Sequence, residues 1–161
     1  MKILRCCRAD GTSRNGFIWP ELGPVEAPDW NPEPKCGGGL HGWARGEGND
    51  YAWCHNDDDL WMVVDVAEED IVYLDRKVKF RKGVVEYRGD VRTATDLILL
   101  AHPGAACNWA TLTGGDRATL TGGDRATLTG GDRATPTGGD RATLTRGSSA
   151  TPTGGDHGTL T

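Results

Sequence analysis

The candidate metal-binding side chains lie in the first half of this sequence. Cys36 lies five residues before His41, and Cys54 is followed directly by His55. A structural zinc site takes four such ligands, usually as closely spaced pairs of cysteines or histidines. That pairing is absent here, and adjacent residues such as Cys54 and His55 rarely reach one ion together. We expect buried thiols and a structural histidine rather than a zinc site, and hence no bound metal.

A run of three carboxylates, Asp57-Asp58-Asp59, follows these residues. Carboxylate oxygens are ligands that hard cations prefer. The run also directly precedes an apolar stretch, where charges on a solvated loop discourage pairing of a strand edge. We expect the solvated loop.

His41 and Glu86 are the candidate catalytic residues if this part of the chain is an enzyme. A histidine in the glycine-rich stretch of residues 37–41, with Glu86 on a later predicted strand, loosely resembles the sites of ADP-ribosyl-transferring enzymes. The resemblance implies an enzyme that acts on a nucleotide. The motif that should accompany such a site is missing, so we expect no catalytic residues, no cofactor and no enzymatic activity, and keep the nucleotide-directed enzyme as an alternative.

Short β-like runs, separated by glycine and proline, would position these side chains. Residues 71–74, 77–80 and 84–87 are typical of short strands, and residues 60–66 form an apolar run of the kind buried inside a sheet. The one helix expected covers residues 93–100. We predict a small α+β domain over residues 1–104 with a mostly antiparallel sheet. Further strands are expected at residues 2–6 and 16–19 and at the end of the glycine-rich segment 37–43, with a proline-rich loop between them.

Five motifs in this first part are similar to those of a family of uncharacterised bacterial and phage proteins. In that family a domain of unknown function often precedes short tandem repeats, which implies a two-part architecture and an origin in a phage or mobile element. It implies no activity. The motifs are Gly16-Phe17-Ile18-Trp19-Pro20, Ala27-Pro28-Asp29-Trp30-Asn31-Pro32, Cys36-Gly37-Gly38-Gly39-Leu40-His41-Gly42, Trp61-Met62-Val63-Val64-Asp65-Val66 and Lys77-Val78-Lys79-Phe80.

An octapeptide repeat occupies the rest of the chain, from Asn108 onward. Its unit is Asp-Arg-Ala-Thr-Leu-Thr-Gly-Gly. The segment Ala-Thr-Leu-Thr alternates as a strand does, and Gly-Gly before a polar pair is typical of a turn, where we expect glycine to supply positive φ. A strand and a turn repeated with a fixed period predict a β-solenoid over residues 105–161, in place of a disordered Gly/Thr/Asp tail.

Two prolines indicate how many units form one coil. Pro136 and Pro152 replace the leucine of the unit and lie sixteen residues apart. A coil of about 16 residues places both in one column and leaves the other column entirely leucine, whereas a coil of three units would mix them. Because each proline removes a donor from the ladder, that side should be the weaker one.

The cost of burying hydroxyl groups decides which face of each strand points inward. Each threonine turned inward without a hydrogen-bond partner would cost about 1–3 kcal/mol. Alanine and leucine should therefore fill the interior, with threonine rows outside as the candidate interaction surface. These threonines are Thr111, Thr113, Thr119, Thr121, Thr127, Thr129, Thr135, Thr137, Thr143, Thr145, Thr151 and Thr153.

The repeat resembles the octapeptide of ice-nucleation proteins through its glycine turn and its Thr-x-Thr strand, as at Thr119-Leu120-Thr121. In that family flat Thr-x-Thr arrays are thought to order water, which implies an ice-binding surface. Asp stands here where that family has a tyrosine thought to join solenoids. The array is also too short for efficient nucleation.

Calcium is a second ligand that the glycine pair and the aspartate suggest, because calcium-binding nonapeptide solenoids combine the same residues. Their period is nine, and here an arginine follows Asp116, Asp124, Asp132 and Asp140. We expect these Asp-Arg pairs to compensate each other's charge at the stacked corners, each worth a few tenths of a kcal/mol.

Charge and composition narrow the partners. The repeat carries five arginines and five aspartates, so the net charge of −5 lies in the first 107 residues and gives no basic surplus for nucleic acid. No stretch has the length of a membrane span, and none has the apolar core of a signal peptide. With an odd number of cysteines, we expect a reduced cytoplasmic chain without nucleic-acid or membrane partners.

Three functions remain for this architecture. We expect a non-enzymatic structural protein, either a spacer or a solenoid that self-associates into dimers or filaments through an uncapped end at Leu160 and Thr161. The first alternative is ice binding through the threonine rows. The second is the nucleotide-directed enzyme in the N-terminal domain.

Overall fold

The chain divides into two units, Met1–Ala101 and His102–Thr161, where the sequence placed the boundary after Gly104. The computed structural model describes residues 1–48, 56 and 58–161. Each unit has its own sheets and its own hydrophobic interior, which supports the prediction of an α+β domain followed by a β-solenoid.

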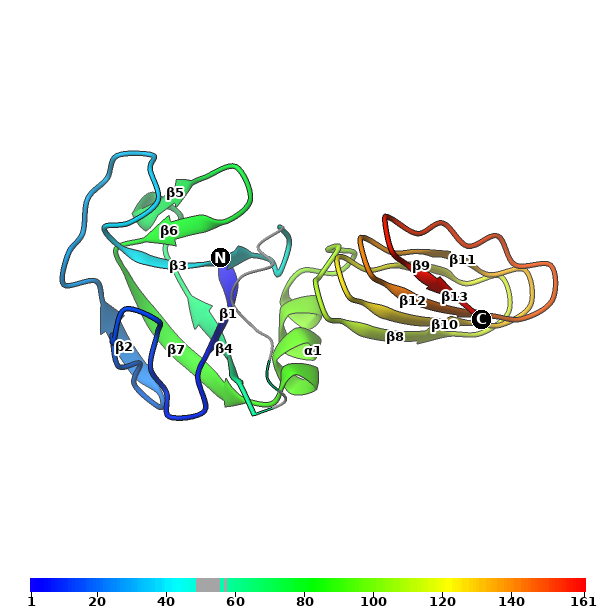
Figure 1. Cartoon of the computed structure of the whole chain (residues 1–161), viewed down its shortest axis with the longest axis horizontal. Helices are drawn as coiled ribbons and strands as arrows, with labels where there is room; N and C mark the ends of the chain where they lie inside the picture. Colours follow the sequence, from blue (N-terminus) through cyan, green and yellow to red (C-terminus); the bar gives the residue numbers. More distant parts are fainter. Residues whose placement is uncertain (49–55, 57) are drawn as a thin grey trace. The chain divides into compact units, whose positions relative to one another are not determined.

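A seven-stranded antiparallel sheet forms the described part of the first unit, in the order β2-β7-β4-β1-β3-β6-β5 (Figure 1). A short 3-10 helix, Glu68–Asp70, precedes β5, and the helix α1, Val91–Ala101, follows β7. The strands are β1 (Lys2–Cys7), β2 (Gly23–Glu26), β3 (Leu40–Ala44), β4 (Leu60–Asp65), β5 (Ile71–Tyr73), β6 (Val78–Phe80) and β7 (Lys82–Gly89).

Sequence patterns predicted six of these strands and the helix, and missed β2. The proline-rich segment that we expected to be a loop contains β2, which pairs Pro24 with Val84 of β7. Proline is tolerated there because β2 lies at the edge of the sheet, where a missing N–H need not break a ladder on both sides. No strand forms at residues 16–19, where one was expected, and Ile18 makes only a single bridge with Thr12.

The core of the first unit lies against the central strands β1 and β4. Ile3 pairs with Val64, and both side chains are fully buried with Trp19 and Phe80. The helix α1 contacts β4, β1 and β7 and buries Ala94 and Ile98. Its start is fixed by Asp90, whose carboxylate accepts hydrogen bonds from the backbone N–H and the hydroxyl of Thr93 at 2.8 and 2.9 Å. These bonds and one from Tyr87 lower the pKa of Asp90 to about 2.

The second unit is a solenoid with two parallel sheets, seen as stacked coils in Figure 1. Four strands form one sheet, in the order β13-β12-β10-β8, which we call face A. The pair β11-β9 forms the other, which we call face B, and a bridge between Thr137 and Thr153 extends it. The strands are β8 (Thr111–Gly114), β9 (Thr119–Thr121), β10 (Thr127–Gly130), β11 (Thr135–Thr137), β12 (Thr143–Arg146) and β13 (Thr159–Leu160).

The register confirms the coil of 16 residues. Leu128 lies opposite both Leu112 and Leu144, and Leu144 lies opposite Leu160, so face A is the all-leucine column. Pro136 lies opposite Leu120 on face B. The proline side has the shorter ladder, as the loss of backbone donors predicts.

Burial also confirms the orientation of the strands. Leu128, Leu144, Ala126 and Ala142 are fully buried in the interior of the solenoid. The outward threonines of β9, β10 and β11 are exposed, and Thr111 and Thr143 are half-buried. The interior is thin, and alanine and leucine fill it without leaving a hydroxyl unsatisfied.

Two further expectations concern the redox state of the cysteines and the presence of membrane-spanning helices. Among the cysteines that the structure describes, Cys6 is disulfide-bonded and Cys7, Cys36 and Cys107 are not, so the expectation of a fully reduced chain is wrong at Cys6. In the described part of the chain, no helix combines the length and the hydrophobicity that crossing a membrane requires.

Candidate functional site

Face A presents threonine hydroxyls in two straight rows. Thr127 lies opposite Thr111 and Thr143 in the neighbouring coils, and Thr129 lies opposite Thr113 and Thr145. The rows continue to Thr159 and Thr161, and the hydroxyl oxygens of Thr145 and Thr161 are 3.1 Å apart. Hydroxyl groups therefore repeat at the strand spacing of about 4.8 Å along each row and at about 6.6 Å between the rows.

Face B carries the corresponding rows with fewer coils. Thr119 and Thr121 lie opposite Thr135 and Thr137, and Thr153 adds a single bridge beyond Thr137. Pro136 still accepts a hydrogen bond from Thr153 N–H at 2.9 Å through its carbonyl, but it has no N–H to donate. Face A is consequently the more regular array of the two.

The two corners of each coil are held by side chains stacked 16 residues apart. Asp124 Oδ1 accepts a hydrogen bond from Asp140 N–H at 3.0 Å, and Asp140 Oδ1 accepts one from Asp156 N–H at 2.9 Å. Asn108 begins this ladder by accepting from Asp124 N–H at 2.8 Å. At the other corner Asp116 and Asp132 form the same ladder and end at Ser148 N–H.

The positive φ of the turn lies on the residue after each aspartate, not on glycine. Arg117, Arg125, Arg133 and Arg141 all have φ between 57 and 62°, while none of the glycines in the repeat has positive φ. The expectation that glycine supplies the left-handed conformation is therefore wrong. The left-handed conformation allows the backbone N–H to bond to the next coil. Arg133 N–H, for example, donates a hydrogen bond to the carbonyl oxygen of Ser148 at 3.0 Å.

Close approach, rather than conformation, explains the glycine pair. A Cβ atom on Gly114 would lie 2.6 Å from the Cβ of Ala118, so the first glycine leaves room for the next alanine. A Cβ atom on Gly131 would lie 2.5 Å from Asp116 Oδ1, so the second glycine leaves room for the aspartate ladder. Both contacts recur along the solenoid because the glycine pair, the alanine and the aspartate keep a fixed spacing in the octapeptide.

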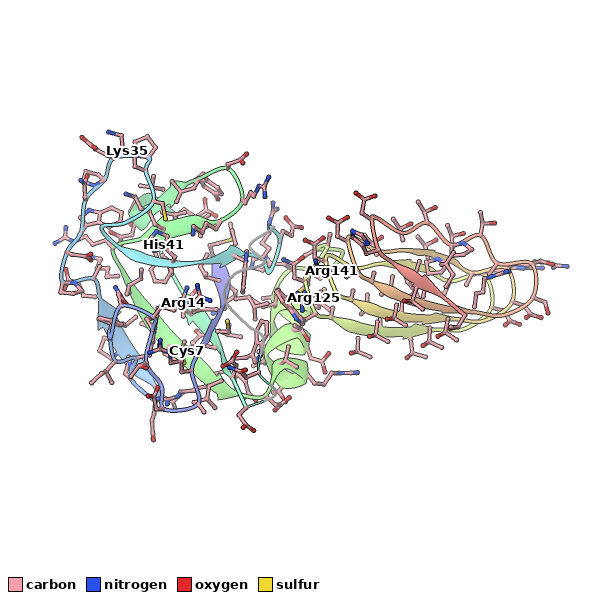
Figure 2. All side chains as sticks on the ribbon, viewed as in Figure 1. Cys7, Arg14, Lys35, His41, Arg125 and Arg141 are labelled. Atoms are coloured by element: carbon pink, nitrogen blue, oxygen red, sulfur yellow. The ribbon has the colours of Figure 1, made fainter. Side chains whose placement is uncertain are left out.

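The corners thus use aspartate as a backbone acceptor. Burial raises the pKa of Asp124, and the carboxylate of Asp140 one coil away adds to the rise. Arg125 lies 5.6 Å from the ring centre of Trp109, and Arg141 occupies the equivalent position one coil further on; Figure 2 labels both arginines. Within the described residues, no group of three or more His, Cys, Asp or Glu side chains could hold a metal ion. Charge compensation between each Asp and the following Arg stays a prediction.

A cavity of about 480 Å³ is present in the first unit, and it contains several of the residues that the sequence singled out. Its lining includes Cys36, the glycines that follow it, and His41, and Figure 2 shows the places of Arg14 and His41 in this unit. His41 Nε2 accepts a hydrogen bond from Gly37 N–H at 3.4 Å. Burial, together with the charges of Lys77, Arg5 and Lys79, lowers the pKa of His41 to about 4, so the ring is neutral at pH 7.

A family model described as a domain of unknown function, DUF7666, matches residues 1–96, which include the whole of this sheet. The chain belongs to the DUF7666 family. The match covers the motifs that resembled an uncharacterised family, although the origin of the chain in a phage stays a prediction.

Ice nucleation proteins are among the curated relatives of the chain. One from Pseudomonas fluorescens is 34% identical over 98 residues, and one from Pseudomonas syringae is 33% identical over 98 residues. Each alignment covers 60% of this chain and 8% of the relative, so the chain spans only a small part of their length. No solved structure matches the chain.

The DUF7666 domain does not bring His41 and Glu86 together. His41 lies on β3 and Glu86 on β7, and β1 and β4 lie between these strands in the sheet. Glu86 instead accepts a hydrogen bond from Lys2 Nζ at 2.6 Å, in an ion pair that raises the pKa of that lysine. Three strand spacings separate the two candidates by about 14 Å, too far for one proton-transfer site.

The other candidates have separate outcomes. Of the zinc candidates, Cys36 and His41 line the cavity of the DUF7666 domain, whereas Cys54 and His55 lie outside the described residues. Asp57 also lies outside them, so the cation alternative for its run stays untested.

Sequence reasoning missed Arg5 and Lys79, which are 6% and 1% exposed. The sequence signal for these two buried charges was a charged residue between the apolar residues of β1 and of β6.

Proposed function

We propose that face A of the solenoid binds ice through its two threonine rows. The observation that carries this proposal is the register: the threonines of β8, β10 and β12 are paired in both rows without a shift. Such an array repeats in two directions at fixed distances. A crystal surface is a ligand that also repeats in two directions, whereas a soluble small molecule would contact only a few of the repeated hydroxyls.

The threonine side chain suits this role because it combines a hydroxyl group with a methyl group on a branched Cβ. Branching restricts its χ1 angle, so little rotational entropy is lost on binding a surface. The parallel ladder beneath the rows fixes the backbone, and buried Leu128 and Leu144 fix the strands from inside. The repeating hydroxyls are therefore preorganised.

The relatives support the choice of ligand. Those that match the chain are ice nucleation proteins, and the chain spans 8% of their length. The paired threonine rows support binding to ice that already exists, and this is the activity that we propose for face A. Binding of this kind needs no enzyme and no cofactor.

The chain offers a matched control for the experiment because faces A and B carry equivalent threonines. Changing Thr127, Thr129, Thr143 and Thr145 to lysine puts bulky charges on face A, and changing Thr119, Thr121, Thr135 and Thr137 to lysine does the same on face B. Thermal hysteresis and inhibition of ice recrystallisation are measured for both variants and the parent. We expect the face A variant to lose the effect and the face B variant to keep most of it.

Circular dichroism of both variants checks that the solenoid remains folded. A parent chain without hysteresis or recrystallisation inhibition would remove the proposal. Equal loss in the two variants would show that face A has no special part in binding.

We propose self-association through the last coil as a second candidate function. Leu160 is 58% exposed, whereas the equivalent Leu128 and Leu144 are fully buried. In the described chain β13 pairs only with β12. On face B the last proline, Pro152, has no N–H to donate, so pairing with another copy would use β13.

Sedimentation velocity over a range of concentrations tests this second proposal. We expect the mass of the parent to rise with concentration and the Leu160→Lys variant to remain a monomer. Leu22 in the other unit is 63% exposed and gives the matched control, Leu22→Lys. A parent that stays monomeric, or a control variant that dissociates equally, would contradict assembly through β13.

A further inference from the structure

One corner of the solenoid carries a groove of about 590 Å³ that polar residues line. Three successive coils contribute to it, each with the two residues at the same place in its unit. The pairs are Asp116-Arg117, Asp132-Arg133 and Ser148-Ser149, and all six residues are exposed. Because the coils repeat at the strand spacing of about 4.8 Å, the groove offers polar contacts again at each step along the stack.

The aspartates of the groove are held in place by the backbone of the next coil. Oδ1 of Asp116 accepts from Asp132 N–H at 3.0 Å, and Oδ1 of Asp132 accepts from Ser148 N–H at 2.7 Å. The glycines Gly131 and Gly147 pack against the same two oxygen atoms, since a Cβ on either would lie 2.5 or 2.6 Å away. The second oxygen of each carboxylate, Oδ2, makes no hydrogen bond or ion pair with a described residue. Each aspartate therefore presents a fixed acceptor that the fold does not use.

The arginines of the groove share one backbone conformation, so their side chains leave the corner in the same direction. Arg117 and Arg133 have φ of 62 and 59°. Their backbone N–H groups donate to the carbonyls of Asp132 and Ser148 at 2.8 and 3.0 Å. Ser149, with φ of 60°, continues the column with a hydroxyl group. Neither guanidinium forms a hydrogen bond or an ion pair with a described residue, so unused donors lie in the same groove as the unused acceptors.

The charges of the lining decide which class of ligand fits. Two carboxylates and two guanidiniums give the groove a formal charge of zero. An anion attracted by the guanidiniums is repelled by the carboxylates, and the reverse holds for a cation, so neither gains from the groove as a whole. A neutral hydroxyl group can donate to a carboxylate and can accept from a guanidinium, and hydrogen bonds to charged groups are the stronger kind. The lining therefore favours a neutral ligand that is rich in hydroxyl groups.

We propose that this groove binds an extended polysaccharide of neutral sugars. Each sugar carries neighbouring hydroxyl groups, of which one can donate to an aspartate while the next accepts from the arginine of the same coil. The rise per sugar in an extended chain is close to the rise per coil, so successive sugars meet successive coils. A small zwitterion would match one Asp-Arg pair and leave the repetition unused. The groove lies at a corner, separate from the threonine rows of the two faces, and the proposal goes beyond ice binding and self-association.

Isothermal titration calorimetry of the full chain with neutral β-1,4-linked hexasaccharides tests the proposal. The probes are cellohexaose, mannohexaose and xylohexaose. Cellobiose, mannobiose and xylobiose show whether two sugars suffice, and hexagalacturonic acid is a charged chain of the same length. Because a hexasaccharide reaches all three coils, we expect at least one to bind at least tenfold more tightly than its disaccharide and than hexagalacturonic acid.

Arg133→Ala is the main variant, because Arg133 is exposed and its guanidinium makes no hydrogen bond or ion pair with a described residue. Arg141→Ala changes the same position of the unit at the opposite corner, where φ is 57° and the side chain is also exposed, and serves as the control. Circular dichroism checks that both variants keep the solenoid. We expect Arg133→Ala to weaken hexasaccharide binding at least fivefold and Arg141→Ala to change it less than twofold.

Three results would overturn the proposal. The first is no binding of any neutral hexasaccharide at millimolar concentration. The second is equal loss of binding in the two arginine variants, which would place the sugar outside this groove. The third is binding of a disaccharide or of hexagalacturonic acid as tightly as the neutral hexasaccharides, which would contradict recognition of an extended neutral chain.

Discussion

At the scale of single residues, the aspartates of the repeat act through one oxygen atom each. Asp124 accepts from the backbone of Asp140 and donates its own N–H to Asn108, so it joins three successive coils of one corner. Asn108, at the first position of this ladder, accepts a backbone hydrogen bond in the same way but carries no charge. The hydrogen-bond acceptor, rather than the charge, is what the stack requires at this place.

The first prediction separates these two properties at Asp124. Asp124→Asn keeps an acceptor and removes a carboxylate whose pKa burial raises, so the free energy of unfolding should change by less than about 0.5 kcal/mol. Asp124→Ala leaves Asp140 N–H without its acceptor and should cost about 1–2 kcal/mol. Urea unfolding followed by hydrogen exchange of the repeat amides measures both. Equal destabilisation by the two changes would mean that the charge itself matters.

The second prediction concerns His41, whose pKa of about 4 lies below the ordinary value near 6.5. The folded protein binds this proton less readily than the unfolded chain does. The contribution to stability is therefore complete above pH 6.5 and is lost as the pH falls toward 4. His41→Gln retains an acceptor for Gly37 N–H and does not titrate, so its unfolding free energy should fall less over this interval. Urea unfolding at several pH values gives the profile of the unfolding free energy for the parent and for the variant. Parallel profiles would contradict the prediction.

At the scale of elements, the glycine pair shows how one coil fits on the next. From Gly131 onward, the second glycine of each unit lies against the aspartate of the coil before it, as Gly131 does against Asp116. Gly115 occupies the same position in the first unit of the repeat, and a Cβ there would meet nothing within 4 Å. At the same position of the unit, the stack therefore requires glycine at residues such as Gly131 but not at Gly115.

The third prediction compares alanine at these two glycines. Neither has positive φ, so backbone strain does not enter the comparison. Gly131→Ala should destabilise the solenoid by about 1–3 kcal/mol, because the methyl group forces apart two coils. Gly115→Ala should be neutral or stabilise by up to about 1 kcal/mol, because it restricts only the unfolded chain. Thermal unfolding of both variants measures the difference, and a similar loss in both would contradict the stacking argument.

Elements with a strong period were predictable, and those that depend on distant partners were not. β4 and the solenoid strands follow directly from apolar runs and alternation. β2 was missed because its pairing with β7 compensates for Pro24, and no local pattern shows that partner. The left-handed turn residue was assigned to glycine because glycine adopts positive φ most easily. The stacked hydrogen bonds place it on arginines such as Arg117 and Arg133 instead.

At the scale of the whole molecule, the repeat makes the second unit extensible. Each coil contacts only its neighbours, so the stability of a solenoid is close to a sum over coils and the interfaces between them. The threonine rows of face A lengthen with every coil in the same way.

The fourth prediction follows from this additivity. A second copy of residues 116–131, inserted after Gly131, adds one complete coil and keeps every later column in register. We expect stronger protection of the repeat amides from hydrogen exchange and a larger effect on ice than the parent shows. An insert with the same sixteen residues in scrambled order is the control and should give neither gain. A coil copy that behaves like the scrambled insert would show that the columns do not stack as described.

The sequence alone determined the architecture of the second unit. In a stack of coils, the contacts of each residue recur at a fixed separation along the chain, so the positions of Pro136 and Pro152 were enough to reveal the 16-residue coil and its two unequal faces. The cost of burying hydroxyls was enough to place the threonines outside. Tertiary structure decided what depends on strands that are distant in sequence: the separation of His41 from Glu86, and the cavity lined by His41 and the glycines that follow Cys36. Antiparallel pairing over long separations leaves no period in the sequence from which these places could be calculated.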